Sequence, residues 1–185
     1  GGLWGKVKNL LSLGEAAPAW PGNAGDAVRI GRYKTARDKP LGEGGPSKVW
    51  KSLYGHYAVK LIHPGAMALP GVREEAAILR AIDKTDLPVA KLLAESRDGK
   101  VLIKEFIEGS TAHEILEASA FSRSQSEGWP ELAAKLIQGG LTADLARGNL
   151  VWQHWRTRWV IVDAGSLTDG GPKAVLDQML APELL

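Results

Sequence analysis

Three polar residues near the C-terminal end have the types and spacing of a site that holds magnesium beside phosphates. Asp144 and Asn149 lie five residues apart, and Asp163 follows fourteen residues later, where an apolar run ends in Asp-Ala-Gly. A carboxylate and an amide oxygen at the ends of one hairpin can converge on a hard cation that keeps several waters and bridges phosphates. Asn149 and Asp163 are therefore the predicted metal ligands. This leaves Asp144 to accept a proton from an incoming hydroxyl group or to orient it.

The N-terminal half adds groups that suit phosphates. The stretch Leu-Gly-Glu-Gly-Gly-Pro-Ser at residues 41–47 predicts a turn between two strands. Backbone N–H groups there can approach phosphate oxygens, because glycine has no Cβ. Lys60 lies inside an apolar strand, where a lysine is unusual, and Glu75 on the next predicted helix can partner it. Taken singly, each of these features is more typical of an ordinary turn or a solvated surface.

The elements that must position these groups are short strands followed by helices. Runs of β-prone residues between turn residues predict strands at residues 28–33, 49–53, 57–62, 89–94 and 101–106. Helices are predicted from Pro70, from the capping box of Thr111 and Glu114 to about residue 118, and from Pro130 to residue 138. Residues 122–128 are predicted to be a polar loop, and residues 150–162 a hairpin. Strands first and helices later indicate an α+β fold in two lobes.

Composition is that of an ordinary globular protein and excludes several classes. The 185 residues are 44% hydrophobic and 24% charged, which suits one domain or two small lobes that share a cleft. A net charge of +2 gives no support to nucleic-acid binding, and the absence of cysteine excludes disulfides and cysteine-based zinc sites. The lack of cysteine fits a cytoplasmic protein and also one that refolds after secretion. No apolar run reaches the roughly 18 to 20 residues that span a bilayer.

The first 27 residues are expected to be an amphipathic segment and a linker. Apolar residues at helical spacing are followed by a stretch rich in Gly, Ala and Pro. Such a segment packs on its own domain more often than on a membrane. The Gly-Gly start without methionine is expected for a piece cut from a longer protein.

In order and spacing, these pieces resemble the protein kinase superfamily over residues 28–168. The resemblance implies that Lys60 and Glu75 pair to hold the α- and β-phosphates of ATP, that Asp144 is the catalytic base, and that Mg²⁺ is the metal. It also implies that a loop of Gly42, Gly44, Gly45 and Ser47 covers the phosphates and that Val49 and Ala58 sandwich the adenine. The backbone of a hinge at Glu105 and Ile107 would bind the adenine edge, with Lys104 in the gatekeeper position.

The same resemblance divides the chain and exposes its departures. It implies an N-lobe at residues 28–109, with the hinge at 104–109, and a strongly truncated C-lobe at residues 110–185. Ser47 replaces the third glycine of the loop, and Ala164 replaces the aromatic residue of Asp-Phe-Gly. Thr142-Ala143 stands where kinases carry His-Arg, so a phosphate on the activation loop has no arginine partner. Only 22 residues follow Asp163, and most of the peptide-docking platform is missing.

A kinase reduced this far is similar to the minimal effector kinases of plant-associated bacteria, the HopBF type, in its size, its truncation and its retained catalytic set. That similarity implies delivery into a host or target cell and phosphorylation of a hydroxyl on a folded host protein. The ninety-kilodalton heat-shock chaperone is the candidate substrate, and an immunity protein or a chaperone is a further candidate partner. Related domains also form the tips of large polymorphic toxins.

Other functions share parts of this pattern. A small-molecule kinase of the aminoglycoside-phosphotransferase type has the same fold, but normally has His-Gly before the catalytic aspartate and a large helical C-lobe. A nucleotide-binding pseudokinase would normally have lost residues such as Lys60 and Asp163, which this chain retains. Transfer of a nucleoside monophosphate is a third alternative. Trp152, Trp155 and Trp159 cluster in the predicted hairpin and are expected to pack in the core, with an exposed partner-binding patch as the alternative.

Overall fold

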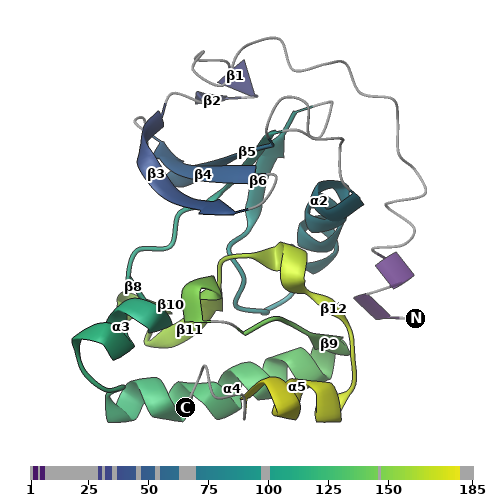
Figure 1. Cartoon of the computed structure of the whole chain (residues 1–185). Helices are drawn as coiled ribbons and strands as arrows, with labels where there is room; N and C mark the ends of the chain where they lie inside the picture. The colour runs from purple at the N-terminus through teal and green to yellow at the C-terminus, as the bar shows by residue number, and fades with distance from the viewer. Residues whose placement is uncertain are drawn as a thin grey trace.

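The structure is a computed structural model, and it describes residues 2–3, 5–6, 29–30, 32–34, 37–44, 47–52, 55–62, 70–96, 101–145 and 147–179. Figure 1 shows an upper part with a β-sheet and the helix α2 beside it, and a lower part that holds the helices α3, α4 and α5. This is an α+β architecture with antiparallel sheets. No helix among these residues is long and apolar enough to cross a membrane.

Five antiparallel strands form the main sheet, in the order β3-β4-β5-β7-β6. Their bounds are β3 Arg37–Gly44, β4 Ser47–Ser52, β5 Tyr57–Ile62, β6 Leu92–Glu95 and β7 Val101–Glu105. Because side chains alternate along a strand, the two faces of the sheet differ. One face is an apolar cluster of Tyr57, Val59, Val101 and Ile103, with Trp50 packed against it. The other face carries Ala58, Lys60, Leu102 and Lys104, which pair across β5 and β7.

Two of the predicted strands differ from the observed ones. The run at residues 28–33 folds back on itself as the short pair β1 Arg29–Ile30 and β2 Tyr33–Lys34, so that β3 precedes the glycine-rich turn instead. The run at residues 89–94 joins the main sheet only from Leu92. The reason is that Pro88 and Ala90 form backbone hydrogen bonds with Ile161 of another sheet, and Val89 makes a parallel bridge to the same residue.

Helix α2, Pro70–Ile82, carries Glu75 to the inner face of the main sheet. Proline suits the first position of a helix, because its missing N–H has no partner there and its φ is already helical. Ile78, Leu79 and Ile82 of α2 are buried and belong to the large apolar core of the lower part. The helix is thus held between the sheet above and the core below.

The lower part is mostly helical and contains two small sheets. The helices are α3 Ala112–Ala118, α4 Arg123–Gly139 and α5 Pro172–Met179. One small sheet joins β8 Ser110–Thr111, β10 Leu150–Gln153 and β11 Arg158–Ile161, and the other joins β9 Leu141–Thr142 and β12 Thr168–Asp169. Three 3₁₀ turns complete it: η1 Arg147–Asn149, η2 His154–Arg156 and η3 Ala164–Ser166. The predicted hairpin at residues 150–162 and the capping box of Thr111 and Glu114 are both present.

Helix α4 begins seven residues before the predicted start, so the expected loop at residues 122–128 is wrong. Ser122 and Gln125 form a capping box, in which each side chain accepts a hydrogen bond from the other's backbone N–H. Pro130 therefore lies inside the helix and not at its first position. The N-terminal turns are polar because they face solvent, apart from Gly128, which is buried against Trp159.

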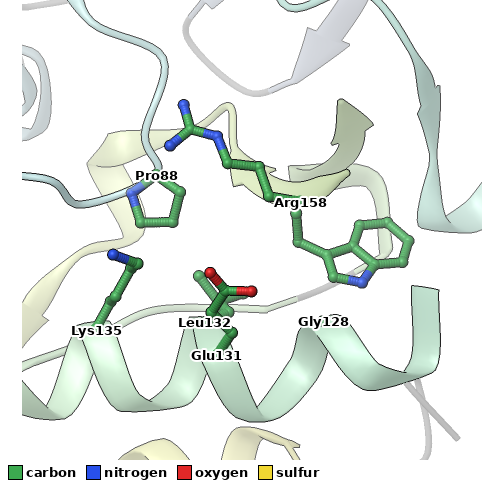
Figure 2. A pocket seen from close by; sticks show the side chains of 7 residues that line it. Pro88, Gly128, Glu131, Leu132, Lys135 and Arg158 are labelled. Carbon is green, nitrogen blue, oxygen red and sulfur yellow. The ribbon is translucent and has the colours of Figure 1, made fainter. Parts of the chain in front are cut away.

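An aromatic cluster joins α4 to the β10–β11 hairpin. Trp129 stacks on Trp159 with their ring centroids 4.0 Å apart, and Phe121 meets both rings edge-on. The indole N–H of Trp159 donates to the carbonyl of Gln125. Trp152 and Trp159 are buried as expected, but Trp155 at the turn is 73% exposed, so its predicted place in the core is wrong. A small pocket beside this cluster is lined by Pro88, Glu131 and Lys135, among others (Figure 2). Its volume of about 10 Å³ admits one water molecule at most.

Among the described N-terminal residues, Leu3 lies on the chain's own core. Leu3 is partly buried against the large apolar cluster and approaches the position of Gly139. Helix α5, which the sequence did not predict, packs against α4 and β9 with Val175 fully buried. The residues after Asp163 therefore contribute to the core of the lower part.

Candidate active site

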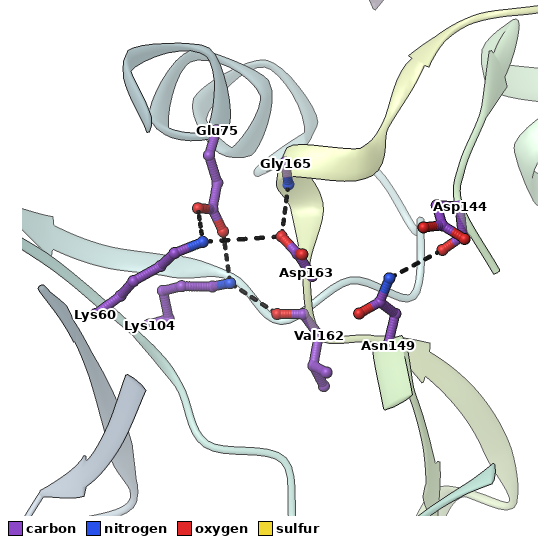
Figure 3. A network of polar contacts seen from close by, with 8 residues as sticks. All are labelled: Lys60, Glu75, Lys104, Asp144, Asn149, Val162, Asp163 and Gly165. Carbon is purple, nitrogen blue, oxygen red and sulfur yellow. Dashed lines mark hydrogen bonds and ion pairs between the residues drawn. The ribbon is translucent and has the colours of Figure 1, made fainter. Parts of the chain in front are cut away.

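Two lysines hold one buried glutamate between the main sheet and α2. Lys60 Nζ on β5 lies 2.6 Å from Glu75 Oε2, and Lys104 Nζ on β7 lies 2.7 Å from Glu75 Oε1 (Figure 3). Lys60 and Lys104 lie on the same face of the sheet, because Lys104 pairs with Ala58, two residues before Lys60 on β5, and side chains two residues apart on a strand share a face. The structure thus brings together Lys60 and Glu75, and it adds a second cation.

The second cation also reaches the strand end that carries Asp163. Lys104 Nζ donates to the carbonyl oxygen of Val162 at 2.8 Å, and its side chain is only 5% exposed. Lys60 Nζ lies 3.8 Å from Asp163 Oδ1. One closed set of contacts therefore connects the sheet, α2 and the residues just after β11.

The charge of Glu75 is maintained by its two lysines. Burial is the largest influence on this carboxyl group and acts to raise its pKa, since it removes water from the charged form. The ammonium groups of Lys104 and then Lys60 act in the opposite direction, through their charges and their hydrogen bonds. Together they outweigh burial, and the pKa of Glu75 lies below its ordinary value. Glu75 is therefore an anion at neutral pH.

Asn149 lies between the segment of Asp144 and the strand end of Asp163. Its side-chain amide N–H donates to the backbone carbonyl of Asp144 at 3.2 Å, and its backbone carbonyl oxygen accepts from the backbone N–H of Val162 at 2.9 Å. The second bond continues the pairing of the β10–β11 hairpin, and it brings Asn149 next to the residue that precedes Asp163. Asp144 is exposed, between the buried residues Ala143 and Leu145.

Asp163 caps the 3₁₀ turn η3. Its Oδ1 accepts a hydrogen bond from the backbone N–H of Gly165 at 3.1 Å, and 45% of its side chain is exposed. The turn that follows packs against α2, with Ala164 fully buried in the core. A larger aromatic side chain, as in Asp-Phe-Gly, would need space that the core fills here.

The donor set around Asn149 and Asp163 suits Mg²⁺. One amide oxygen and one partly exposed carboxylate are hard ligands, and magnesium takes most of its remaining ligands from water and phosphates. No group of three or more His, Cys, Asp or Glu side chains that could enclose a metal occurs among the described residues. An ion held by Asn149 and Asp163 would take its other ligands from water and phosphate oxygens.

The described residues of the predicted phosphate loop and adenine sandwich lie on β3, β4 and β5 of the main sheet. Gly42 and Gly44 are in β3, paired with Val49 and Ser47 of β4. Val49 in turn pairs with Lys60 of β5, so the glycines lie two strands from the lysine. Gly45 lies outside the described residues. Ala58 is buried on the face of Lys60 and pairs with Lys104 across β7.

The predicted hinge follows β7. Glu105 ends that strand, and its carboxylate accepts from the backbone N–H of Lys91 at 2.9 Å. The backbone N–H of Phe106 donates to the carbonyl of His56, and Ile107 is buried against Val151 and Val160 of the hairpin. The segment between the two parts is therefore fixed on both sides. The adenine contacts of Glu105 and Ile107 stay a prediction.

The sequence indicated the position of Lys104 near the hinge but not its contacts with Glu75 and the Val162 carbonyl. A signal was present: Val-Leu-Ile-Lys-Glu and Tyr-Ala-Val-Lys-Leu are both apolar strands that contain a lysine. Two lysines on neighbouring strands, offset by two residues in the pairing, lie on the same face of the sheet and can contact one carboxylate. The role of the Val162 carbonyl has no sequence signal, because any residue has one.

Comparison with known proteins gives a likeness of fold. No protein-family model matches the chain, and no curated protein sequence matches it. Two solved structures of WbdD are similar to it, one of them a co-crystal with the kinase inhibitor LY294002. The first has a TM-score of 0.54 and 14% identity and covers 78% of this chain, and the second has 0.54, 15% and 77%. Both matches span 35% of the WbdD chain, about a third of its length. The chain therefore has an α+β fold that resembles part of a protein known to bind a kinase inhibitor.

Proposed function

We propose that this chain is a phosphotransferase that uses ATP and magnesium and modifies a hydroxyl group on a protein. The observation that carries the proposal is the contact of Lys60 with both Glu75 and Asp163 at the end of β11. A phosphate-binding lysine must be anchored by a carboxylate and must face the metal-binding aspartate, because phosphoryl transfer depends mainly on positioning and charge. The likeness of fold to WbdD with its kinase inhibitor supports it.

Each residue then has a defined task. Bound MgATP would supply the phosphoryl group to be transferred. Lys60 would neutralise phosphate oxygens, while Asn149 and Asp163 would hold the metal through hard oxygen atoms. Asp144, exposed beside Asn149, would accept the proton of the attacking hydroxyl or orient that group.

We propose further that the acceptor belongs to a folded protein and that the enzyme acts after secretion or transfer into a host or target cell. What supports this is the similarity in size and retained catalytic set to minimal effector kinases, whose implied target is the ninety-kilodalton heat-shock chaperone. Helix α5 packs into the core of the lower part, with Val175 fully buried. A whole folded protein offers enough contact area to bind elsewhere on the surface, whereas a short peptide does not.

Labelled ATP tests the proposal. The protein is mixed with a eukaryotic lysate and ATP labelled on either the γ- or the α-phosphate, and labelled species are identified. We expect label from γ-ATP on a protein with the wild type, none with Asp144→Asn, and wild-type labelling with Asp177→Asn, a surface aspartate that pairs with Lys173. Label on small molecules only indicates a small-molecule kinase, and label from α-ATP indicates nucleotidyl transfer. Absence of label from the folded wild type contradicts the proposal.

A further inference from the structure

We propose that Lys104 is a positioning residue that assembles the nucleotide site: its ammonium group holds Glu75 and the strand end of Asp163 in place before MgATP binds. This inference rests on the proposed function and adds to it the means by which the site is kept ready. It assigns a role to Lys104, which lies outside the predicted phosphate-binding pair of Lys60 and Glu75.

The geometry of Lys104 is that of a link and not of a ligand. Its ammonium group lies 2.7 Å from Glu75 Oε1 and 2.8 Å from the Val162 carbonyl oxygen, and its side chain is 5% exposed. The two acceptors belong to α2 and to the residue before Asp163, which are 87 positions apart in sequence. Figure 3 shows the Lys104 ammonium between these two acceptors. One side chain thus fixes the two elements whose relative position decides whether a kinase-like site is complete.

The strand pairing explains how a lysine fits at this position. Lys104 pairs with Ala58 on β5 and with Leu92 on β6, so it lies on a central strand of the sheet. The small side chain of Ala58 leaves room along the inner face. Lys104 and Lys60 therefore approach Glu75 from neighbouring strands, and each takes one of its two oxygens.

The second lysine changes what the first can do. Lys60 contacts Glu75 and lies 3.8 Å from Asp163, and in the proposed function it must also turn hydrogens toward phosphates. A buried carboxylate that loses its partner is costly, because its charge is then uncompensated. Because Lys104 keeps Glu75 paired, Lys60 can engage phosphate without leaving a buried charge alone.

This link also accounts for an active arrangement without a phosphorylated loop. In protein kinases, loop phosphorylation and the position of the helix that carries the glutamate bring the lysine pair and the metal-binding aspartate together. Here Ala143 precedes Asp144 and cannot bind a phosphate, yet Glu75 already contacts Lys60. Lys104 supplies the connection from inside the fold.

The test uses the full chain and a matched control on the same strand. Lys104→Met removes the charge and keeps the length of the side chain. Ile103→Ala, the adjacent buried residue on the opposite face of the sheet, lowers stability without touching Glu75. Affinity for MgATP is measured by titration calorimetry at a series of pH values, and folding is monitored by circular dichroism.

We expect Lys104→Met to bind MgATP roughly 10- to 100-fold more weakly, as for the loss of a charge-assisted hydrogen bond. As the pH is lowered, we also expect Lys104→Met to lose MgATP binding at a higher pH than the wild type does. The groups that face Glu75 are Lys60 on β5 and Lys104 on β7, with Asp163 beyond Lys60. Without Lys104, Glu75 takes up a proton more readily. The protonation of ATP itself is common to all variants. Ile103→Ala should keep the wild-type affinity and pH dependence.

Two results overturn the inference in distinguishable ways. If the wild type binds MgATP and folded Lys104→Met binds it with the same affinity and pH dependence, Lys104 has no positioning role while the proposed function stands. If the folded wild type does not bind MgATP at any pH, both fail. If Lys104→Met does not fold, Lys104→Gln, which keeps a hydrogen-bond donor for the Val162 carbonyl but no charge, is measured with the same criteria.

Discussion

Replacing Glu75 with glutamine should destabilise the fold and should do so through Lys104. Glu75 is fully buried, and Lys104 beside it is 5% exposed, so the variant leaves a buried ammonium group with no anionic partner at that position. Removal of one member of a buried ion pair costs about 3 to 5 kcal/mol. Glutamine keeps the volume and can accept one hydrogen bond, which places our expectation near the lower end, at about 3 kcal/mol.

The double variant separates the charge effect from other effects. In Glu75→Gln with Lys104→Met, the buried ammonium group is gone as well. Lys60, which is 13% exposed and lies near Asp163, then retains an anionic neighbour. We expect the double variant to be less destabilised than the sum of the single variants by about 1 to 3 kcal/mol, the range for residues in one network.

Urea unfolding followed by tryptophan fluorescence measures these energies, since the chain has seven tryptophans and Trp159 is buried. Lys135→Met is the control, because Lys135 pairs with Asp86 on the surface and shares no ion-pair partner with Glu75 among the described residues. Its effect should add to that of Glu75→Gln within about 0.5 kcal/mol. If the change in unfolding free energy of Lys104→Met adds to that of Glu75→Gln as completely as the change of Lys135→Met does, Glu75 and Lys104 are not coupled.

Four further outcomes follow from the structure. Folding lowers the pKa of Glu75, so this carboxylate contributes fully to the free energy of unfolding above its ordinary pKa of 4.5 and loses that contribution as the pH falls through its folded pKa. In urea titrations at decreasing pH, Glu75→Gln should therefore lose less unfolding free energy than the wild type. Gly128→Ala should destabilise by about 1 kcal/mol despite better helix propensity, because its Cβ would lie 2.8 Å from Trp159 Cδ1. Thr142→Val should raise the thermal midpoint, with a gain of about 1 kcal/mol, because this buried hydroxyl has no hydrogen-bond partner among the described residues. Phosphatase treatment should leave phosphoryl transfer unchanged, because Ala143 cannot hold a loop phosphate; a strong drop would contradict this.

Helix α3 and the β10–β11 hairpin were predictable because their signals are local. The capping box of Thr111 and Glu114 needs only residues three apart, and the β10–β11 hairpin needs only apolar runs around a short turn. The contact of Lys60 with Glu75 followed from a lysine in an apolar strand before an amphipathic helix.

The errors have a common physical cause, which is that tertiary contacts decide between local alternatives. Residues 122–128 are polar and gave a loop, although Ser122 and Gln125 carry the same capping signal that located α3. The start of the run at residues 89–94 has strand character, but Pro88 and Ala90 form their backbone hydrogen bonds with Ile161 of β11 and not with β7. The role of Lys104 depends on a carbonyl oxygen 58 residues away, which no local pattern encodes.

The most direct test of the proposed function is a calorimetric titration of the folded chain with ATP, in the presence of magnesium and of EDTA. The account predicts binding that depends on magnesium, with Asp163→Ala losing the magnesium-dependent part, since Asp163 supplies the carboxylate at the end of β11. Asp169→Ala, an exposed aspartate in β12, should bind as the wild type does. Equal affinity with magnesium and with EDTA, or no binding at all, would contradict the account.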